Sequence, residues 1–302
     1  MTDTAELQST GPSTEPGRSL NFECAPQCGG CCHDLRLPLT VTEAIAWIER
    51  GGTVELLCEA IPWESEPAPD QLVAAHKRRR SFPATSGALP IRVIVVLAAR
   101  FERGCPNLLP DMRCGIYGER PLVCRIYPAE INPFIALEPT HKMCPPQAWS
   151  VPTPFMRGGQ IVDAQVAEDI AQSRAGDQRD APLKARICEI LGIDIAAFST
   201  LGFAVHHPER AALLDALRRV TLEANGQAHV LATAAIHSTE VTSASEATNA
   251  GEAGSSNASV PQWRFSSDRA DYVEALVSIG ALVAADGDAG AGGAPWERLS
   301  LG

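Results

Sequence analysis

The sequence predicts an α+β fold, in which a small, loop-rich domain with clustered cysteines is followed by helical segments and a flexible, acidic C-terminal region. Three observations carry this prediction. Eight of the ten cysteines fall into two groups, Gly and Pro occur 24 and 23 times, and aromatic residues make up only 5% of the 302 residues. A chain with few aromatic side chains and many turn-forming residues builds a modest core that many loops interrupt.

The composition along the chain predicts five segments. Residues 1–20 mix polar residues without periodicity and are expected to be a disordered leader. Residues 21–150 hold the clustered cysteines and form the first domain. Residues 151–237 are expected to be a helical extension, because apolar residues recur there at spacings of three and four. A low-complexity, flexible linker at 238–260 and a short helix with a loose tail at 261–302 complete the organisation.

Two short helices are predicted near the start of the cysteine-rich domain. LTVTEAIAWIERGG offers Thr40 or Thr42 as an N-cap and Gly51 as a stop. EPAPDQLVAAHKRRR offers Asp70 as a cap and ends on basic residues, which are favourable at the negative end of the helix dipole. The stretch between them, which contains IPWESEPAP, is expected to be a loop.

A buried strand and a third short helix are predicted next. Residues 91–99, IRVIVVLAA, are rich in β-branched side chains and are about half as long as the ~20 residues that cross a membrane. Pro121 suits the first turn of a helix that carries Cys124 and Arg125 and stops at Pro128. The strand and the helix therefore bring cysteines of the second group to their ends.

Helical periodicity dominates beyond Trp149. It is found in GGQIVDAQVAEDIAQSRA, APLKARICEILGI, HPERAALLDALRRVTLEANG and DRADYVEALVSIGALVAA. Cys188 lies on one of these apolar faces and is interpreted as a core thiol. Cys58 stands alone in ELLCEA, which is predicted to be helical, and is also set apart from the clustered cysteines. The pair His206 and His207 is interpreted as an ordinary polar entry to a helix.

Charge and targeting signals limit the partners. The net charge is −11, and HKRRR is the one basic run, so nucleic-acid binding is disfavoured. The first residues lack a positive start followed by an apolar run, so we expect a cytoplasmic protein without a membrane partner. In a reducing cytosol ten cysteines are not expected to form disulfides, which leaves metal binding or redox chemistry as the reason for their clustering.

The eight clustered cysteines are the candidate metal ligands. They are Cys24, Cys28, Cys31 and Cys32 in the first group, and Cys105, Cys114, Cys124 and Cys144 in the second. Thiolates hold zinc, and also iron–sulfur clusters, four at a time. The set therefore suits two four-thiolate sites, or one cluster with spare ligands.

The adjacent pair Cys31 and Cys32 constrains the arrangement. Pro26, Gly29 and Gly30 allow the first loop to fold around a centre. On an extended strand, however, neighbouring side chains point to opposite faces, so both sulfurs share one ion only if the backbone turns sharply. We favour an arrangement in which Cys31 completes a site with its own loop while Cys32 reaches toward the second group.

Several charged and aromatic residues lie beside these cysteines. Arg120 and Arg125 are expected to compensate the negative thiolates and to favour the ionised form, whereas Arg113 is expected to form a surface ion pair. His33 and His141 are possible further ligands, although eight thiols already suffice. Tyr117 and Tyr127 are expected to pack against the cluster.

These motifs together resemble a known family. CAPQCGGCC followed by LTVTEA, then CPNLLPDMRCGIYGERPLVCRIYP and a later Cys144, resembles the YkgJ-like cysteine-cluster family of zinc- or iron-chelating proteins, over residues 21–150. The family's central pattern is matched by Cys114, Ile116, Tyr117, Arg120, Pro121, Cys124, Arg125, Tyr127 and Pro128. The resemblance implies metal chelation by the clustered cysteines. One branch, the flagellin lysine N-methylases, is similar in this motif and is associated with an iron–sulfur centre.

Three functions follow as hypotheses. The first is a metal-binding protein of unassigned reaction, with zinc or iron, including an iron–sulfur cluster, as the cofactor. The second is an iron–sulfur-dependent, protein lysine N-methyltransferase-like enzyme, although the chain lacks a Gly-rich strand-to-helix turn for S-adenosylmethionine. The third is a thiol redox sensor. Besides the metal ion, a protein partner for the C-terminal half is possible.

Overall fold

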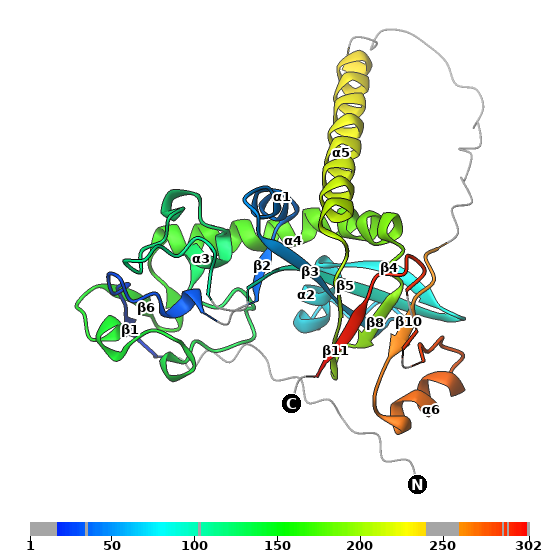
Figure 1. The fold of residues 1–302 in the computed structure, drawn as a ribbon, viewed down its shortest axis with the longest axis horizontal. Coiled ribbons are helices and arrows are strands. Elements are labelled where there is room, and N and C mark those ends of the chain that lie inside the picture. Colours follow the sequence, from blue (N-terminus) through cyan, green and yellow to red (C-terminus); the bar gives the residue numbers. More distant parts are fainter. Residues whose placement is uncertain are drawn as a thin grey trace. The chain divides into compact units, whose positions relative to one another are not determined.

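The computed structural model describes residues 17–33, 36–101, 104–239, 260–285, 287–288 and 290–300. Helices and multi-stranded sheets are both present, which confirms the α+β class (Figure 1). Most of the leader expected at 1–20 and of the linker expected at 238–260 lies outside the described residues. The chain divides into two compact units, and each is assembled from segments that do not follow one another in sequence.

The first unit comprises residues 1–55, 66–80 and 96–180, and the second comprises residues 56–65, 81–95 and 181–302. Three elements contribute residues to both units: β3 (Thr53–Pro62), β5 (Leu89–Arg100) and α4 (Ala164–Leu191). All eight clustered cysteines belong to the first unit.

The first unit contains short helices and a small sheet. Its helices, besides part of α4, are α1 (Val41–Glu49), α2 (Leu72–Arg79) and α3 (Leu122–Ile126). Its short 3₁₀ turns are η1 (Gly30–Cys32), η2 (Tyr117–Glu119), η3 (Pro139–His141) and η4 (Pro146–Trp149). The sheet has the order β1 (Leu20–Asn21), β6 (Pro154–Arg157) and β7 (Gln160–Ile161). In addition, β2 (Leu37–Leu39) pairs antiparallel with residues 97–99 of β5.

Helix α1 begins and ends as the sequence predicts. The Thr40 side chain accepts a hydrogen bond from the Glu43 amide, and the Glu43 carboxylate accepts one from the Thr40 amide at 2.8 Å, which completes a capping box. Gly51, just beyond the helix, has a φ of 94°, a value that glycine adopts without strain. The apolar face of α1 is buried and includes Trp47 and Ile48.

A compact apolar cluster lies beneath the cysteine-rich loops of the first unit. Its buried members are Ile126, Ala129, Leu137, Phe155, Met156, Val166 and Ile170. Phe22 joins this cluster from the N-terminal side, with its ring centroid 4.8 Å from that of Trp149 and 5.3 Å from that of Phe155. Aromatic contacts of this kind connect the segment just before Cys24 to the segment just after Cys144.

Two details of this region differ from the sequence prediction. The N-cap of α2 is Gln71, and Asp70 provides no side-chain cap. The expected loop between α1 and α2 contains the strand β3, so Cys58 lies on a strand and the helix placement of ELLCEA was wrong. Because five consecutive residues of β3 are buried, the strand shows none of the apolar–polar alternation that identifies a half-exposed strand.

The second unit is built on a mixed sheet. Its further strands are β4 (Ser81–Ser86), β8 (Ile195–Phe198), β9 (Gly202–His206), β10 (Arg264–Ser266) and β11 (Trp296–Ser300). Strand β8 pairs in parallel with both β10 and β3, while β9 pairs antiparallel with β3 and β11, and β4 with β5. Two helices follow the expected sequence segments, α5 (Arg210–Thr239) and α6 (Ala270–Ser278).

The expected helical extension is therefore interrupted by strands. The first two predicted helices beyond Trp149 form the single helix α4, which continues through Pro182. His206 ends β9 rather than starting a helix, so its interpretation as a polar helix entry was wrong. Its ring is fully buried, and Nε2 lies 2.8 Å from the carbonyl oxygen of Ile195.

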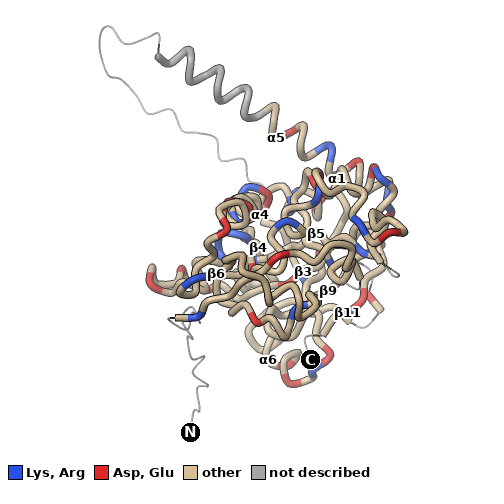
Figure 2. The backbone as a smooth tube through the Cα atoms, turned by 90° about the vertical axis from the view of Figure 1, so that its left-hand side faces the viewer, with Lys and Arg blue, Asp and Glu red and all other residues tan. Residues whose placement is uncertain are grey.

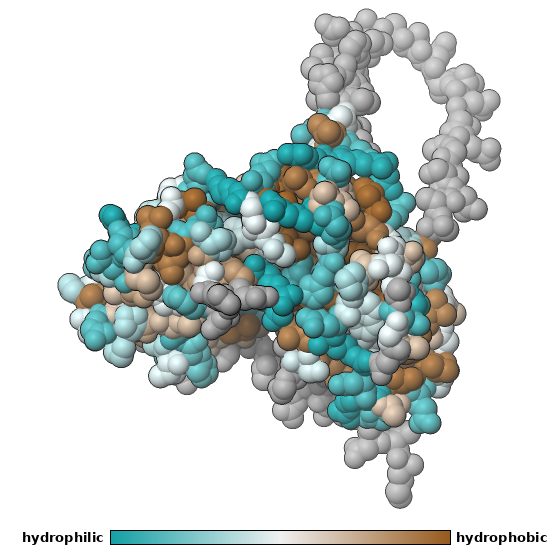
Figure 3. All heavy atoms as spheres, viewed as in Figure 1, coloured by the Kyte–Doolittle hydropathy of each residue, from teal (hydrophilic) through white to brown (hydrophobic). Residues whose placement is uncertain are grey.

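The surface of the described residues is mixed in charge and polarity. Lys and Arg are interspersed with Asp and Glu along the chain in Figure 2, and the face shown in Figure 3 combines hydrophilic and hydrophobic residues. Among the described residues, no helix has both the length and the apolar composition needed to cross a membrane.

Candidate metal centre

Seven of the eight clustered cysteines line one cavity of about 640 Å³, which we call the cysteine hollow. They are Cys24, Cys28, Cys31, Cys32, Cys105, Cys114 and Cys124. Apolar side chains, including Trp47 and Met112, complete its wall. All ten cysteines of the chain are free thiols, and none of the eight clustered ones is fully buried. Cysteines from the two distant segments therefore line the same cavity.

The first cysteine segment turns sharply at its adjacent pair. Gly29 has a φ of 59°, and the amide of Cys32 donates a 3.0 Å hydrogen bond to the carbonyl oxygen of Gly29. The ring nitrogen Nδ1 of His33 lies 2.9 Å from the same oxygen. Since Cys31 and Cys32 lie in the 3₁₀ turn η1 rather than on an extended strand, both sulfurs can belong to the same hollow.

The second cysteine segment is joined to the first through its backbone. The amide of Cys105 donates a 2.7 Å hydrogen bond to the carbonyl oxygen of Cys32. Cys114 is held nearby because it forms an isolated antiparallel bridge with Leu108. The side-chain amide of Asn107 lies 3.9 Å from the Cys105 sulfur, within the range of a hydrogen bond to sulfur.

Cys124 is positioned by the short helix α3. Pro121 is the N-cap of this helix, and its carbonyl oxygen accepts a 2.9 Å hydrogen bond from the Cys124 amide. The Leu122 amide donates to the Glu43 carboxylate at 2.7 Å, so the capping residue of α1 also caps α3. Sequence analysis did not name Glu43, although the Thr-x-x-Glu spacing that begins at Thr40 is the signature of a capping box and is a signal that points to it.

Cys144 does not line the cysteine hollow, but it lies close to the first cysteine group. The Tyr127 hydroxyl accepts a 2.7 Å hydrogen bond from the amide of Met143, the residue that precedes Cys144. A Cβ atom added to Gly30 would lie 2.7 Å from the Met143 carbonyl oxygen, so the two loops are in direct contact. Burial, together with the charges of Cys31 and Cys24, raises the pKa of Cys144 to about 11.

The charge of Cys31 raises the pKa values of several neighbouring thiols. The Cys32 thiol donates a hydrogen bond to the Cys31 sulfur, which lowers the pKa of Cys31 to about 6 and raises that of Cys32. Burial raises the pKa of Cys124 to about 12, with the charges of Cys31 and Cys105 as further causes. Burial likewise raises the pKa of Cys24 and of Cys105.

The three arginines that were expected beside the cysteines have different surroundings. Arg120 lines the hollow, and its guanidinium carbon lies 3.7 Å from the centroid of the Tyr117 ring. Arg113 also lines the hollow, although it is exposed and forms the expected surface ion pair, with Asp111. Arg125 does not line the hollow and lies 3.5 Å from the buried carboxylate of Asp169. Its contacts therefore give no support to a role beside the thiolates.

Two other expectations concern His141 and Tyr117. His141 ends the 3₁₀ turn η3 and does not line the cysteine hollow. Tyr117 is 63% exposed, so it covers Arg120 rather than packing in a core. Tyr127, by contrast, is the aromatic hydroxyl that contacts the cysteine loops.

The donor chemistry of the hollow fits zinc or iron, because soft thiolates are preferred ligands of both zinc and iron–sulfur clusters. The candidate ligands do not form a complete coordination site in this structure. Among the described residues, no three Cys, His, Asp or Glu side chains already stand close enough together to hold a metal ion. Binding therefore requires the sulfur atoms to move closer together than they are in this structure.

The fold and the site define a cysteine-rich domain in which seven thiols line one cavity. Residues 23–145 match the family model described as "Putative zinc- or iron-chelating domain", which covers all eight clustered cysteines. This match agrees with the resemblance of the motifs to the YkgJ-type family and supports metal binding by this segment. No curated protein and no solved structure matches the chain.

Proposed function

We propose that the eight clustered cysteines bind zinc or iron in two groups of four thiolates. One group contains Cys31 and the other contains Cys32. The observation that carries this proposal is the convergence of seven of these cysteines on one hollow, with the eighth, Cys144, in contact with the same loop. Four thiolates complete a tetrahedral zinc site or hold one iron–sulfur cluster.

The division into two groups follows the neighbours of each thiol. After burial, the charges of Cys31, Cys24 and Cys28 are the causes that raise the pKa of Cys144. These four cysteines make the first group. The other four cysteines make the second group, because the charges of Cys105 and Cys114 both raise the pKa of Cys32 and of Cys124, to which Cys31 also contributes. This division keeps the sequence prediction that Cys31 and Cys32 serve different centres. It differs from that prediction by moving Cys144 from the second group to the first.

The chain supplies positive charge at the same place. Thiolates brought together repel one another, and a bound cation offsets this repulsion. Arg120 adds a permanent positive charge to the wall of the hollow, and this charge favours the ionised form of Cys24, Cys31 and Cys124. When bound, the metal provides the cross-link that holds the cysteine loops, and its binding free energy contributes to their folding.

Elemental analysis of protein purified without oxygen tests this proposal. We expect stoichiometric zinc or iron, and a brown colour with visible absorption if the iron is held in a cluster. A colourless protein with zinc assigns the site to zinc. Protein with neither metal, whose eight thiols all react with a thiol reagent in the native state, would contradict metal binding by either route.

A thiol redox sensor is the second candidate, favoured by the hydrogen bond between the adjacent thiols of Cys31 and Cys32. Mild peroxide treatment of the metal-free protein, followed by mass spectrometry, distinguishes redox sensing from metal binding. A reversible disulfide in metal-free protein that is also formed at the same rate in metal-loaded protein favours sensing. Protection by the metal favours the binding function.

The methyl-transfer alternative depends on S-adenosylmethionine binding. Isothermal titration of the metal-loaded protein with this compound provides the test. Heat of binding at a single site supports the enzyme hypothesis, while its absence leaves metal binding as the function.

A further inference from the structure

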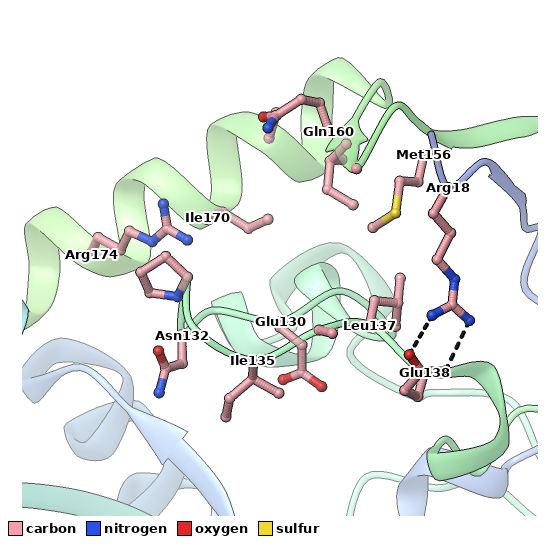
Figure 4. Close-up of a pocket in the computed structure, with 15 residues that line it drawn as sticks. Arg18, Glu130, Asn132, Ile135, Leu137, Glu138, Met156, Gln160, Ile170 and Arg174 are labelled. Carbon is pink, nitrogen blue, oxygen red and sulfur yellow. Dashed lines mark hydrogen bonds and ion pairs between the residues drawn. The ribbon is translucent and has the colours of Figure 1, made fainter. Parts of the chain in front are cut away.

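A second cavity of the first unit, separate from the cysteine hollow in its lining residues, has a volume of about 520 Å³. Figure 4 shows its two walls: α4 carries Ile170 and Arg174 on one side, and the loop with Asn132, Ile135 and Leu137 forms the other. We call it the α4 cavity. Small-molecule sites commonly occupy ~300–1,000 Å³ and combine an apolar wall with few polar groups.

Eight of the fifteen residues that line the α4 cavity have apolar side chains. Its apolar side chains are Pro133, Ile135, Ala136, Leu137, Met156, Ile161, Ala167 and Ile170. Three of them, Leu137, Met156 and Ile170, also belong to the buried apolar cluster of this unit, so packing holds this part of the wall in place. A ligand that fits here therefore has an apolar body.

The charges at the wall balance, except at one end. Arg18 forms a bidentate ion pair with Glu138, in which Nη2 donates to Oε2 at 2.9 Å. Glu130 is paired with Lys142. Arg174 has no acidic partner among the described residues, and its Nε donates to the backbone carbonyl oxygen of Ile131 at 3.0 Å.

Arg174 gives the cavity its positive end. Partial burial, together with the charge of Arg79 at the C-terminal end of α2, lowers the pKa of Arg174. Asp177, on the same helix as Arg174, forms an ion pair with Arg80. Arg174 therefore places a guanidinium without an acidic partner among the described residues in the wall of the cavity, which is a suitable site for an anion.

We propose that the α4 cavity binds a small amphiphilic anion, with its carboxylate or phosphate head group at Arg174 and its apolar chain against Ile170 and Leu137. Arg18 and Glu138 close the far end of the cavity, so the length of the chain is limited. This site goes beyond metal binding, because none of the eight cysteines lines the cavity.

Calorimetric titration of the full, metal-loaded protein with octanoate and with octyl phosphate tests the proposal, and the stronger ligand identifies the preferred head group. We expect saturable binding, at least about tenfold tighter than that of neutral octanol. Hexanoate is expected to bind more weakly than octanoate, by up to about fourfold for each methylene removed.

Variants locate the site. Arg174→Gln is expected to weaken binding of the anions about tenfold or more, and Ala167→Phe, on the exposed side of α4, is expected to block it. Arg269→Gln is the matched control, since that arginine pairs with Asp271 in the second unit. Far-ultraviolet circular dichroism and thermal melts check that each variant is folded.

Three outcomes would overturn the proposal. They are the absence of binding of both anions to the folded protein, equal affinity of the Arg174→Gln protein, and equal affinity for octanol. None of them affects the metal content, so a failure here is distinguishable from a failure of the metal-binding function.

Discussion

The backbone amide of Cys105 donates a 2.7 Å hydrogen bond to the carbonyl oxygen of Cys32, and this contact joins two cysteine segments that are more than seventy residues apart. The contact involves main-chain atoms, so it does not depend on the state of either sulfur. It joins the two segments without any ligand, and a bound metal would add cross-links between their sulfur atoms.

Gly30 offers a sharp test of the contact between the first cysteine loop and the loop of Cys144. In Gly30→Ala the new Cβ would lie 2.7 Å from the Met143 carbonyl oxygen, so backbone must shift. We expect a loss of about 1–3 kcal/mol in unfolding free energy and a lower metal content. Gly118→Ala is the matched control, because no atom lies within 4 Å of its added Cβ. Denaturant melts and elemental analysis provide the measurements.

Replacing single cysteines sorts ligands from core thiols. Cys28→Ser and Cys124→Ser each remove one predicted ligand, one from each group of four, and we expect each variant to lose bound metal. Cys188→Ala is the control, since Cys188 is 1% exposed and belongs, like the buried Cys58, to the second unit. It should lower the melting temperature while the metal content per folded chain stays constant. Equal metal loss in all three proteins would show that the thiols have been sorted wrongly.

The cysteine site was more predictable from the sequence than the fold around it. Thr40 and Gly51 marked the ends of α1 by local backbone chemistry, and the spacing of Cys24, Cys28 and Cys31 marked the first loop. Strand β3 was missed because its burial comes from neighbours distant in sequence. The position of Cys144 was also set by a tertiary contact, that of Gly30 with the Met143 carbonyl, which has no local signal.

Glu43 is expected to be more important than an ordinary capping residue. Its carboxylate accepts hydrogen bonds from the amides of Thr40 and Leu122, and the second of these caps the helix that carries Cys124. We expect Glu43→Ala to cost about 2 kcal/mol of unfolding free energy, because two backbone donors lose a charged acceptor.

The control for this variant is Glu168→Ala, which removes only an exposed side-chain hydrogen bond to Gln172. Its cost should stay below about 0.5 kcal/mol. A Glu43→Ala protein as stable as this control would mean that water replaces both hydrogen bonds without loss.

His206 is expected to make stability depend on pH. Burial lowers its pKa, and its Nε2 donates to the Ile195 carbonyl oxygen in the neutral form. The unfolded chain then binds more protons than the folded chain below pH ~6.5, the ordinary pKa of histidine, so stability falls as the pH decreases from there toward the lowered pKa. Thermal melts from pH 7.5 to 5 measure this slope. His206→Gln should be less stable at pH 7.5 and should show a shallower slope, and an unchanged slope would assign the pH dependence to other groups.

The partial exposure of all eight clustered cysteines has a kinetic consequence. A metal enclosed in a core leaves only when the chain unfolds, whereas a metal held by accessible sulfur atoms can be passed stepwise to a competing chelator. Exchange in this domain should therefore be faster than global unfolding, which makes the bound ion suited to handover as well as to structural support.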